Sequence, residues 1–179
     1  MDLAGLATDL RRVTVELTDG AHAVGSGVVW APDWVVTNAH VAPHVDVTVR
    51  RADGVGAQGR VVARDRGADL ALLHVPGLDL PAATFALTDE LRVGSLVVAV
   101  GHPLGVRGAL TTGIVHSMGA LVPGGRSWIQ GDLRLAPGNS GGPLADAGGR
   151  VVGLNAMIVG TLALAIPAGE VARFVRAAA

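Results

Sequence analysis

The sequence predicts an all-β protein made of two halves and closed by one C-terminal helix. Two observations predict this fold class. Short Val-rich runs recur along the chain between Gly, Pro and Asp, as β-strands do, and one unpatterned segment interrupts them near the middle. Of the 179 residues, 50% are hydrophobic and only 16% are charged, which is ample apolar material for a core.

The first half contains about six expected strands, spaced as in a sandwich or a barrel. They cover residues 12–18, 22–31, 34–39, 45–50, 59–65 and 70–75. Residues 76–92 hold two prolines and show no alternation, so we expect them to connect the two halves. The first half therefore spans about 12–75.

The second half, about 93–167, resumes the strand pattern. Its expected strands cover residues 95–101, 109–118, 126–132, 150–157 and 162–167. The last segment, 168–179, is the one convincing helix, because Val171, Phe174 and Val175 share one face at helical spacing.

One of the five serines lies in an unusual setting, "GNSGG" around Ser140. This pattern fits the nucleophile turn of α/β-hydrolases, but that fold requires a histidine after the serine, and the last histidine is His116. The subtilisin order of Asp, His, Ser is formally possible with Asp19 or Asp33, but it needs helices that the sequence does not show. The remaining order is His, Asp, Ser.

Two residues fit that order. His40 follows a Val-rich strand, and Asp69 stands directly before an apolar strand, where its carboxylate needs a partner such as an imidazole N–H. Imidazole is a competent base near neutral pH and would take the Ser140 proton. The glycines around Ser140 allow a tight turn, in which the N–H groups of Gly138 and Ser140 converge on a carbonyl oxygen that becomes negative.

Composition excludes several other classes of function. The net charge of −1 gives no basic field for nucleic acid, and the absence of cysteine excludes a thiolate nucleophile or a thiolate metal site. His40 and His44 do not form the zinc pattern H-E-x-x-H, because Pro43 intervenes and the Glu is missing. We therefore expect no metal and no cofactor. No apolar run reaches the length of a membrane span, and the first twelve residues lack the pattern of a signal peptide.

Three motifs carry a family resemblance. The segments "TNAHV" (37–41), "DLALLHV" (69–75) and "IQGDLRLAPGNSGGPL" (129–144) resemble the active-site blocks of trypsin-like serine proteases. The segments "GHPLG" (101–105) and "LALAIPAGEVARFV" (162–175) resemble the HtrA/Deg branch, here without a PDZ domain. The resemblance implies two six-stranded antiparallel β-barrels with the site between them.

The same resemblance implies roles for individual residues. It makes His40 the general base, Asp69 the acid that orients it and Ser140 the nucleophile. Gly138 and Ser140 would supply the oxyanion hole.

The resemblance also implies how a substrate binds. The backbone near Asn155, Ala156 and Met157 would pair with an extended polypeptide as an added strand. The polypeptide is the expected partner, and the oligomeric state stays open.

Arg134 precedes Ser140 by six residues, where the family usually has a small residue. If Arg134 points into the specificity pocket, it would favour an acidic substrate side chain or block the pocket. If it points out, as we expect, Leu135, Leu162 and Leu164 would favour a small aliphatic side chain.

Two hypotheses of different classes follow. The first is a serine endopeptidase that cuts extended or unfolded polypeptides through an acyl-enzyme at Ser140. The second is a protease-like module that binds peptides and barely turns over. The location also stays open, since the chain shows no leader while the resemblance points to the cell envelope or the exterior.

Overall fold

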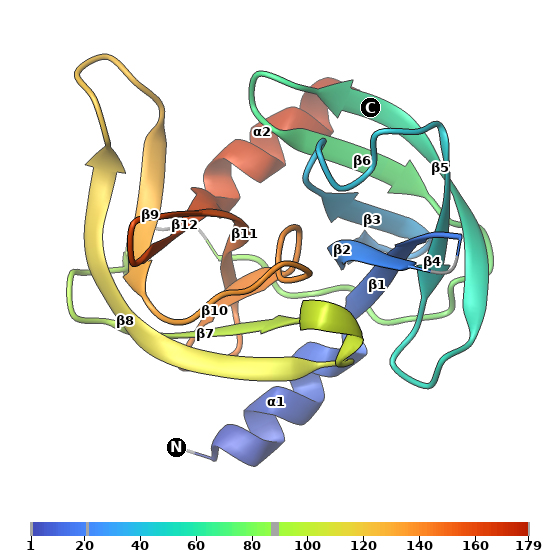
Figure 1. The fold of residues 1–179 in the computed structure, drawn as a ribbon, viewed down its shortest axis with the longest axis horizontal. Helices are drawn as coiled ribbons and strands as arrows, with labels where there is room; N and C mark the ends of the chain where they lie inside the picture. Colours follow the sequence, from blue (N-terminus) through green and yellow to red (C-terminus); the bar gives the residue numbers. More distant parts are fainter. Residues whose placement is uncertain (1, 21, 87–89, 179) are drawn as a thin grey trace.

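The computed structural model describes residues 2–20, 22–86 and 90–178, and they form two closed six-stranded antiparallel barrels (Figure 1). The N-terminal barrel has the strand order β1-β2-β3-β6-β5-β4, and the C-terminal barrel has the order β10-β11-β12-β9-β8-β7. Pairing of β1 with β4 closes the first barrel, and pairing of β10 with β7 closes the second. The predicted all-β fold class is confirmed.

The strands of the N-terminal barrel are β1 (Thr14–Asp19), β2 (His22–Ala31), β3 (Trp34–Thr37), β4 (Asp46–Arg50), β5 (Gly56–Asp65) and β6 (Leu70–His74). Those of the C-terminal barrel are β7 (Leu96–Gly101), β8 (Ala109–Ala120), β9 (Ser127–Asp132), β10 (Pro143–Asp146), β11 (Val151–Val159) and β12 (Leu162–Pro167). The helices are α1 (Leu3–Arg12) and α2 (Ala168–Ala178), with a short 3₁₀ turn, η2 (Pro103–Gly105), after β7.

Strand β1 shows how alternation builds the N-terminal barrel. Val15 and Leu17 lie in the barrel core and are fully buried. Glu16, between them, is also buried, and its carboxylate forms an ion pair with Arg107 from the C-terminal half. On the outer face of β1, Arg107 of the C-terminal half therefore contacts Glu16, and the Leu10 carbonyl of α1 accepts from the Thr14 hydroxyl.

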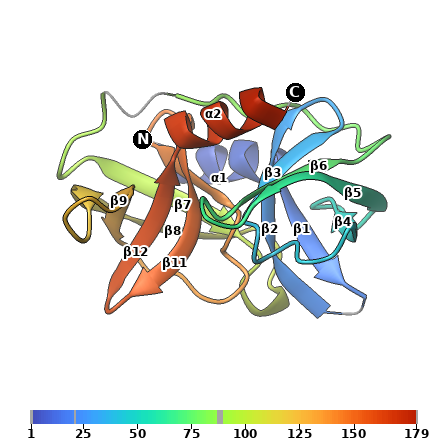
Figure 2. The ribbon, with the colours of Figure 1, turned by 90° about the horizontal axis from the view of Figure 1, so that it is seen from above.

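A core shared by both barrels holds the two halves together. It contains Leu70 and Leu72 of β6, and Leu154 and Leu164 of the C-terminal barrel. Helix α2 lies across the junction of the barrels, with Val171 buried in this core (Figure 2). Phe174 and Val175, which the sequence places on the same helix face, pack against the core as well.

Helix α1 is an element that the strand pattern did not reveal. Asp2 caps it, accepting hydrogen bonds from the N–H groups of Ala4 and Gly5, both at 3.0 Å. Leu10 is buried against the outer side of β7. The sequence does contain a signal for this helix, namely an N-cap Asp followed by apolar residues at helical spacing.

Two further features lie outside the sequence pattern. Strand β10 is four residues long and begins at a proline, so it offers little alternation to detect. In the expected connection 76–92, Phe85 bridges to Val151 and its ring contacts Trp30, with centroids 4.5 Å apart. Residues 87–89 of that connection lie outside the described residues.

Candidate active site

His40 and Asp69 form the best-defined polar pair of the site. His40 follows β3, Asp69 precedes β6, and these two strands are neighbours in the barrel. The His40 Nδ1 atom lies 3.0 Å from Asp69 Oδ1 and 2.9 Å from Oδ2, and the His40 backbone N–H donates to Oδ1 at 3.1 Å. The carboxylate thus holds both the ring and the backbone of His40.

The turn before β6 holds Asp69 in an uncommon backbone conformation. Asp69 has a φ of 54°, in the left-handed region that only a few non-glycine residues adopt. The Asn38 side chain donates to the Asp69 carbonyl at 3.0 Å, and Arg126 donates to the neighbouring Ala68 carbonyl at 2.7 Å. Arg126 also pairs with Glu170 of α2 at 2.9 Å. Sequence reasoning missed Arg126, which reaches this turn from the other barrel.

The glycines around Ser140 are required by close backbone approach. Gly138 and Gly141 have φ values of 106° and 81°. A Cβ atom at Gly138 would collide with the His102 carbonyl, and one at Gly141 with the Ser26 carbonyl and the Thr37 hydroxyl. The sequence predicted a tight turn here but not the partners that crowd it.

A backbone hydrogen bond connects the Ser140 turn to the N-terminal barrel, near the segment that holds His40. The Ser26 N–H of β2 donates to the Ser140 carbonyl at 2.8 Å. Gly25 separates this carbonyl from Val41, because a Cβ at Gly25 would lie 3.0 Å from the carbonyl and against the Val41 side chain. The structure therefore brings the His40 and Ser140 segments together across β2.

The Ser140 hydroxyl donates to the Ala156 carbonyl at 3.0 Å. Within the described ranges, it has no hydrogen bond to His40. The backbone N–H groups of Gly138 and Ser140 likewise have no hydrogen-bond partner among the residues described. Two donors are thus left free beside the serine.

Strand β11 presents a free edge next to Ser140. Its pairing with β10 ends at Leu154, whereas its pairing with β12 continues to Val159. Ala156 lies at an irregularity in that second pairing. Asn155 is buried, and its side chain donates to the Gly142 and Pro143 carbonyls at 3.2 and 2.9 Å. Its backbone carbonyl accepts from Gly141 at 2.8 Å.

An apolar pocket of about 250 Å³ opens beside Ser140. Leu135, Met157 and Ile158 form its apolar walls. Arg134 does not line it: its side chain is exposed and belongs to a neighbouring hollow over β8. Leu164 is fully buried in the shared core and does not line the pocket either.

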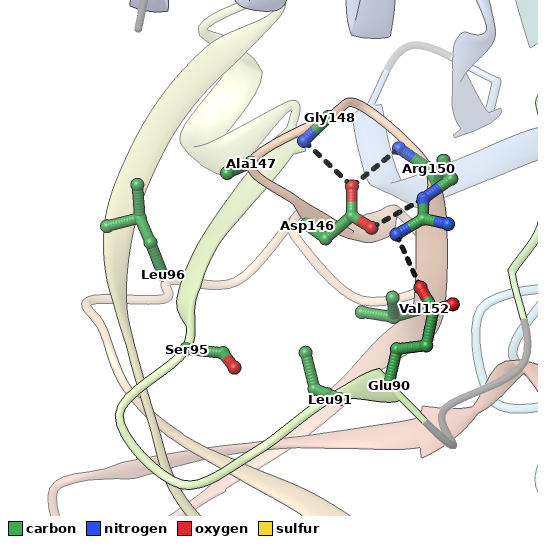
Figure 3. A pocket seen from close by; sticks show the side chains of 9 residues that line it. All are labelled: Glu90, Leu91, Ser95, Leu96, Asp146, Ala147, Gly148, Arg150 and Val152. Carbon is green, nitrogen blue, oxygen red and sulfur yellow. Dashed lines mark hydrogen bonds and ion pairs between the residues drawn. The ribbon is translucent and has the colours of Figure 1, made fainter.

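A larger hollow, of about 320 Å³, lies on the C-terminal barrel and shares no residue with the pocket at Ser140 (Figure 3). Arg150 lines one side of it and pairs with Asp146 at 2.8 Å and with Glu90 at 3.1 Å. These hydrogen bonds, first that to Asp146, raise the pKa of Arg150 above its ordinary value. Because these three charged side chains are paired with one another, we assign this hollow no chemical role.

His102 is a buried histidine to which the sequence assigned no chemistry. It follows β7, and only 1% of its surface is exposed. Its Nδ1 atom lies 3.0 Å from the Ser26 hydroxyl, which donates to the Gly138 carbonyl at 2.7 Å. Burial, and secondly the charge of Arg107, lower the pKa of His102 to about 4, so the ring is neutral at physiological pH.

The structure offers no metal-binding cluster in the ranges it describes, where no three His, Cys, Asp or Glu side chains converge. In the same part of the chain, no helix has the length and apolar character to span a lipid bilayer.

Two antiparallel barrels that bring a His–Asp pair and a serine on a glycine turn to their junction define a trypsin-like protein. Residues 25–154 match the family described as trypsin-like peptidase domain. The chain belongs to this family, and its resemblance to the HtrA/Deg proteases is confirmed by the relatives that it matches.

Over 142 residues, the chain is 39% identical to a protein of Ectopseudomonas mendocina (strain ymp) named probable periplasmic serine endoprotease DegP-like. That match covers 77% of this chain and 30% of the relative, so the matched segment spans less than a third of the relative's length.

Among solved structures, the chain resembles the HtrA-type protease AlgW with a decapeptide, with a TM-score of 0.90 and 25% identity. This match covers 99% of the chain and 67% of AlgW. An inactive form of Rv3671c from M. tuberculosis H37Rv, a serine-to-alanine mutant, matches with a TM-score of 0.84 and 28% identity, over 96% of the chain and 89% of that protein.

Proposed function

We propose that this domain is a serine endopeptidase with His40, Asp69 and Ser140 as its catalytic triad. The observation that carries the proposal is the His40–Asp69 pair, with both carboxylate oxygens within 3.0 Å of Nδ1, beside a serine on a constrained glycine turn. Because Asp69 accepts the Nδ1 proton, the other ring nitrogen, Nε2, is left as the base.

The reaction begins when Ser140 Oγ attacks the scissile carbonyl carbon and His40 Nε2 takes its proton. The carbonyl oxygen becomes an oxyanion, and the free N–H groups of Gly138 and Ser140 donate to it. The tetrahedral species collapses when the imidazolium of His40 protonates the leaving amine, which gives the acyl-enzyme. Water, deprotonated by His40, then attacks the acyl carbon and releases the acid and Ser140.

The Ser140 hydroxyl must rotate away from Ala156 for this attack, because its proton is engaged by the Ala156 carbonyl. Catalytic hydrogen bonds are often formed only in the complex with substrate. A rotation about the Cα–Cβ bond of Ser140 changes neither the backbone turn nor the two free N–H groups.

The free edge of β11 supports an extended polypeptide as the substrate. A substrate strand added beside Ala156 and Met157 would lead its scissile bond to Ser140. The apolar walls of Leu135, Met157 and Ile158 favour a small aliphatic side chain before the cut bond, with Arg134 outside the pocket. The name of the periplasmic relatives supports a location in the cell envelope.

The alternative is a peptide-binding module with weak turnover. The Ser140 hydroxyl bonded to Ala156 instead of His40 is the observation that favours it. A fluorophosphonate probe, which reacts with an activated serine, separates the two functions. We expect the parent to be labelled and Ser140→Ala to remain unlabelled, with cleavage of an unfolded protein following the same pattern. A folded parent that resists the probe and leaves the protein intact would contradict the endopeptidase.

A further inference from the structure

A buried polar pair joins the two barrels behind the Ser140 turn. Ser26 of β2 and His102, which follows β7, are 0% and 1% exposed. The Ser26 hydroxyl oxygen lies 3.0 Å from His102 Nδ1, 3.1 Å from the His102 backbone nitrogen and 2.7 Å from the Gly138 carbonyl oxygen. All three contacts are within hydrogen-bond distance.

The chemistry of these groups fixes which of them donate. A serine hydroxyl has one proton, and a carbonyl oxygen only accepts, so the 2.7 Å contact requires Ser26 to donate to Gly138. The Ser26 oxygen can then only accept from His102, whose backbone N–H and Nδ1–H are the donors. His102 is therefore in the tautomer with the proton on Nδ1, and the chain of donors runs from His102 through Ser26 to Gly138.

Gly138 is held on both sides by the segment that contains His102. Its own carbonyl accepts from the His102 N–H at 3.3 Å as well as from the Ser26 hydroxyl, and the preceding Pro137 carbonyl accepts from the Leu104 N–H at 3.1 Å. The Pro137–Gly138 peptide is trans, so the Gly138 N–H points opposite to the Pro137 carbonyl, away from Leu104. This N–H is one of the two free donors beside the nucleophile.

The Leu104 backbone is itself in a costly conformation that packing does not explain. It has φ 52° and ψ 30°, in the left-handed region, although its side chain is 81% exposed. Hydrogen bonds hold it instead: its N–H donates to Pro137, and the flanking Gly105 and Val106 donate to His102 and Pro103 at 3.4 and 2.9 Å. The backbone carbonyl of His102 is thus part of the turn that directs the Leu104 N–H at the Pro137 carbonyl.

We propose that Ser26 and His102 are positioning residues that hold Gly138 by its carbonyl group, in the backbone conformation that directs its N–H at the oxyanion. Neither side chain touches the substrate; both act through Gly138. A donor in the N-terminal barrel therefore keeps the oxyanion hole of the C-terminal barrel assembled. The proposal rests on the proposed endopeptidase function of the domain.

Ser26→Ala is the first test, because it removes the hydroxyl and leaves the strand intact. We expect kcat to fall about tenfold to hundredfold with KM within twofold, since deleting an oxyanion donor outright costs about 10²–10³ in rate. The rate of fluorophosphonate labelling should fall by the same factor. Ser127→Ala, at an exposed serine on β9, is the matched control and should retain parental values.

His102 offers a paired test with a built-in rescue. His102→Leu removes the Nδ1–H donor, whereas His102→Asn places a side-chain N–H near the position of Nδ1. We expect the Leu variant to lose activity as Ser26→Ala does and the Asn variant to keep at least half of kcat. Because the two residues act as one unit, the double variant Ser26→Ala/His102→Leu should lose no more than about twofold beyond either single variant. If Ser26→Ala does not fold, the comparison of His102→Leu with His102→Asn still tests the positioning role.

A measurement independent of activity separates this proposal from the proposed function. In protein labelled with ¹⁵N-glycine, we expect the Gly138 amide signal to shift and broaden in Ser26→Ala and His102→Leu but not in His102→Asn. An unchanged Gly138 signal, or equal kcat in the Leu and Asn variants, would overturn the positioning role. If the parent does not react with the fluorophosphonate probe, the endopeptidase function is contradicted instead. The Gly138 amide signal still tests the positioning role in that case, because it does not depend on activity.

Discussion

At the residue scale, Asp69 must adopt a left-handed backbone conformation and also present its carboxylate to His40. Its φ of 54° is tolerated because Asp and Asn visit the left-handed region more readily than most residues. That conformation directs the carboxylate at His40 while the Asp69 carbonyl accepts from Asn38. A substitution that tests the carboxylate should therefore preserve this backbone preference, which makes asparagine the appropriate replacement.

We expect Asp69→Asn to fold normally and to lower kcat by about 10⁴. The amide oxygen accepts from the His40 backbone N–H, which leaves the NH2 group to donate to Nδ1, so the ring is left in the wrong tautomer for Nε2 to act as a base. Asp9→Asn, at an exposed aspartate of α1, is the control. A steady-state assay on a peptide substrate measures both, and a loss below tenfold at position 69 would mean that another group orients His40.

His102 gives a second prediction at this scale, a pH dependence of stability. Its pKa of about 4 in the folded state lies below the ordinary 6.5 of the unfolded state. Between these values the unfolded state binds a proton that the folded state does not, so the free energy of unfolding decreases as the pH falls from 6.5 to 4. At 1.36 kcal/mol per pKa unit, this group contributes about 3 kcal/mol.

Denaturant unfolding at several pH values, with His102→Asn beside the parent, isolates this contribution. The variant lacks the titrating ring, so the difference in unfolding free energy between parent and variant should change by about 3 kcal/mol across the window and level off below pH 4. A difference that stays constant from pH 6.5 to 4 would contradict a neutral buried His102.

At the scale of elements, Arg126 connects three segments that are distant in sequence: the turn before β6, helix α2 and strand β9. From the position directly before β9 it donates to the turn before β6, pairs with Glu170 of α2 and stacks on Trp128, with its guanidinium carbon 4.4 Å from the ring centre. Both charged side chains are about a quarter exposed or less, so removing one leaves a partly buried partner without its hydrogen bonds.

Arg126→Met keeps an unbranched stem over Trp128 but removes every donor. We expect the free energy of unfolding to fall by about 1–3 kcal/mol, the range for lost hydrogen bonds to charged groups. Arg173→Met, at an exposed arginine of α2, supplies the control for charge removal. Chemical denaturation measures both, and equal losses in the two variants would show that the contacts of Arg126 contribute nothing specific.

The same elements show how far the sequence predicts this structure. Strands such as β1 and β11 were found because alternation or Val-rich runs persist for several residues, and α2 because its apolar face is periodic. Strand β10 was not predicted, because four residues that start at a proline are too few to show alternation of apolar and polar side chains. The residues that contact the site could not be predicted from local sequence patterns. Ser26 contacts His102, 76 residues away in the sequence, and Arg126 contacts Ala68, 58 residues away. No local pattern encodes such pairings, since the closed barrels create them.

At the scale of the whole molecule, the two barrels are not independent. The shared core joins Leu70 of β6 to Leu154 of β11 and to Val171 of α2. The proposed site needs residues from both sides, because His40 and Asp69 come from one barrel and Ser140 from the other. A structure in which one barrel unfolds alone would expose this core and lose the site, so we expect the barrels to unfold together.

Tryptophans placed in both barrels allow this to be measured. Trp30 and Trp34 report on the N-terminal barrel and Trp128 on the C-terminal one, so a variant that keeps only Trp128 and one that keeps only the first two give separate signals. We expect both signals to show one denaturation midpoint. Leu70→Ala and Leu154→Ala, one in each barrel, should each lower the free energy of unfolding by about 2–5 kcal/mol and move both signals equally. Two separate midpoints, or a Leu154→Ala effect confined to the Trp128 signal, would mean that the shared core does not couple the barrels and that the N-terminal barrel persists without its partner.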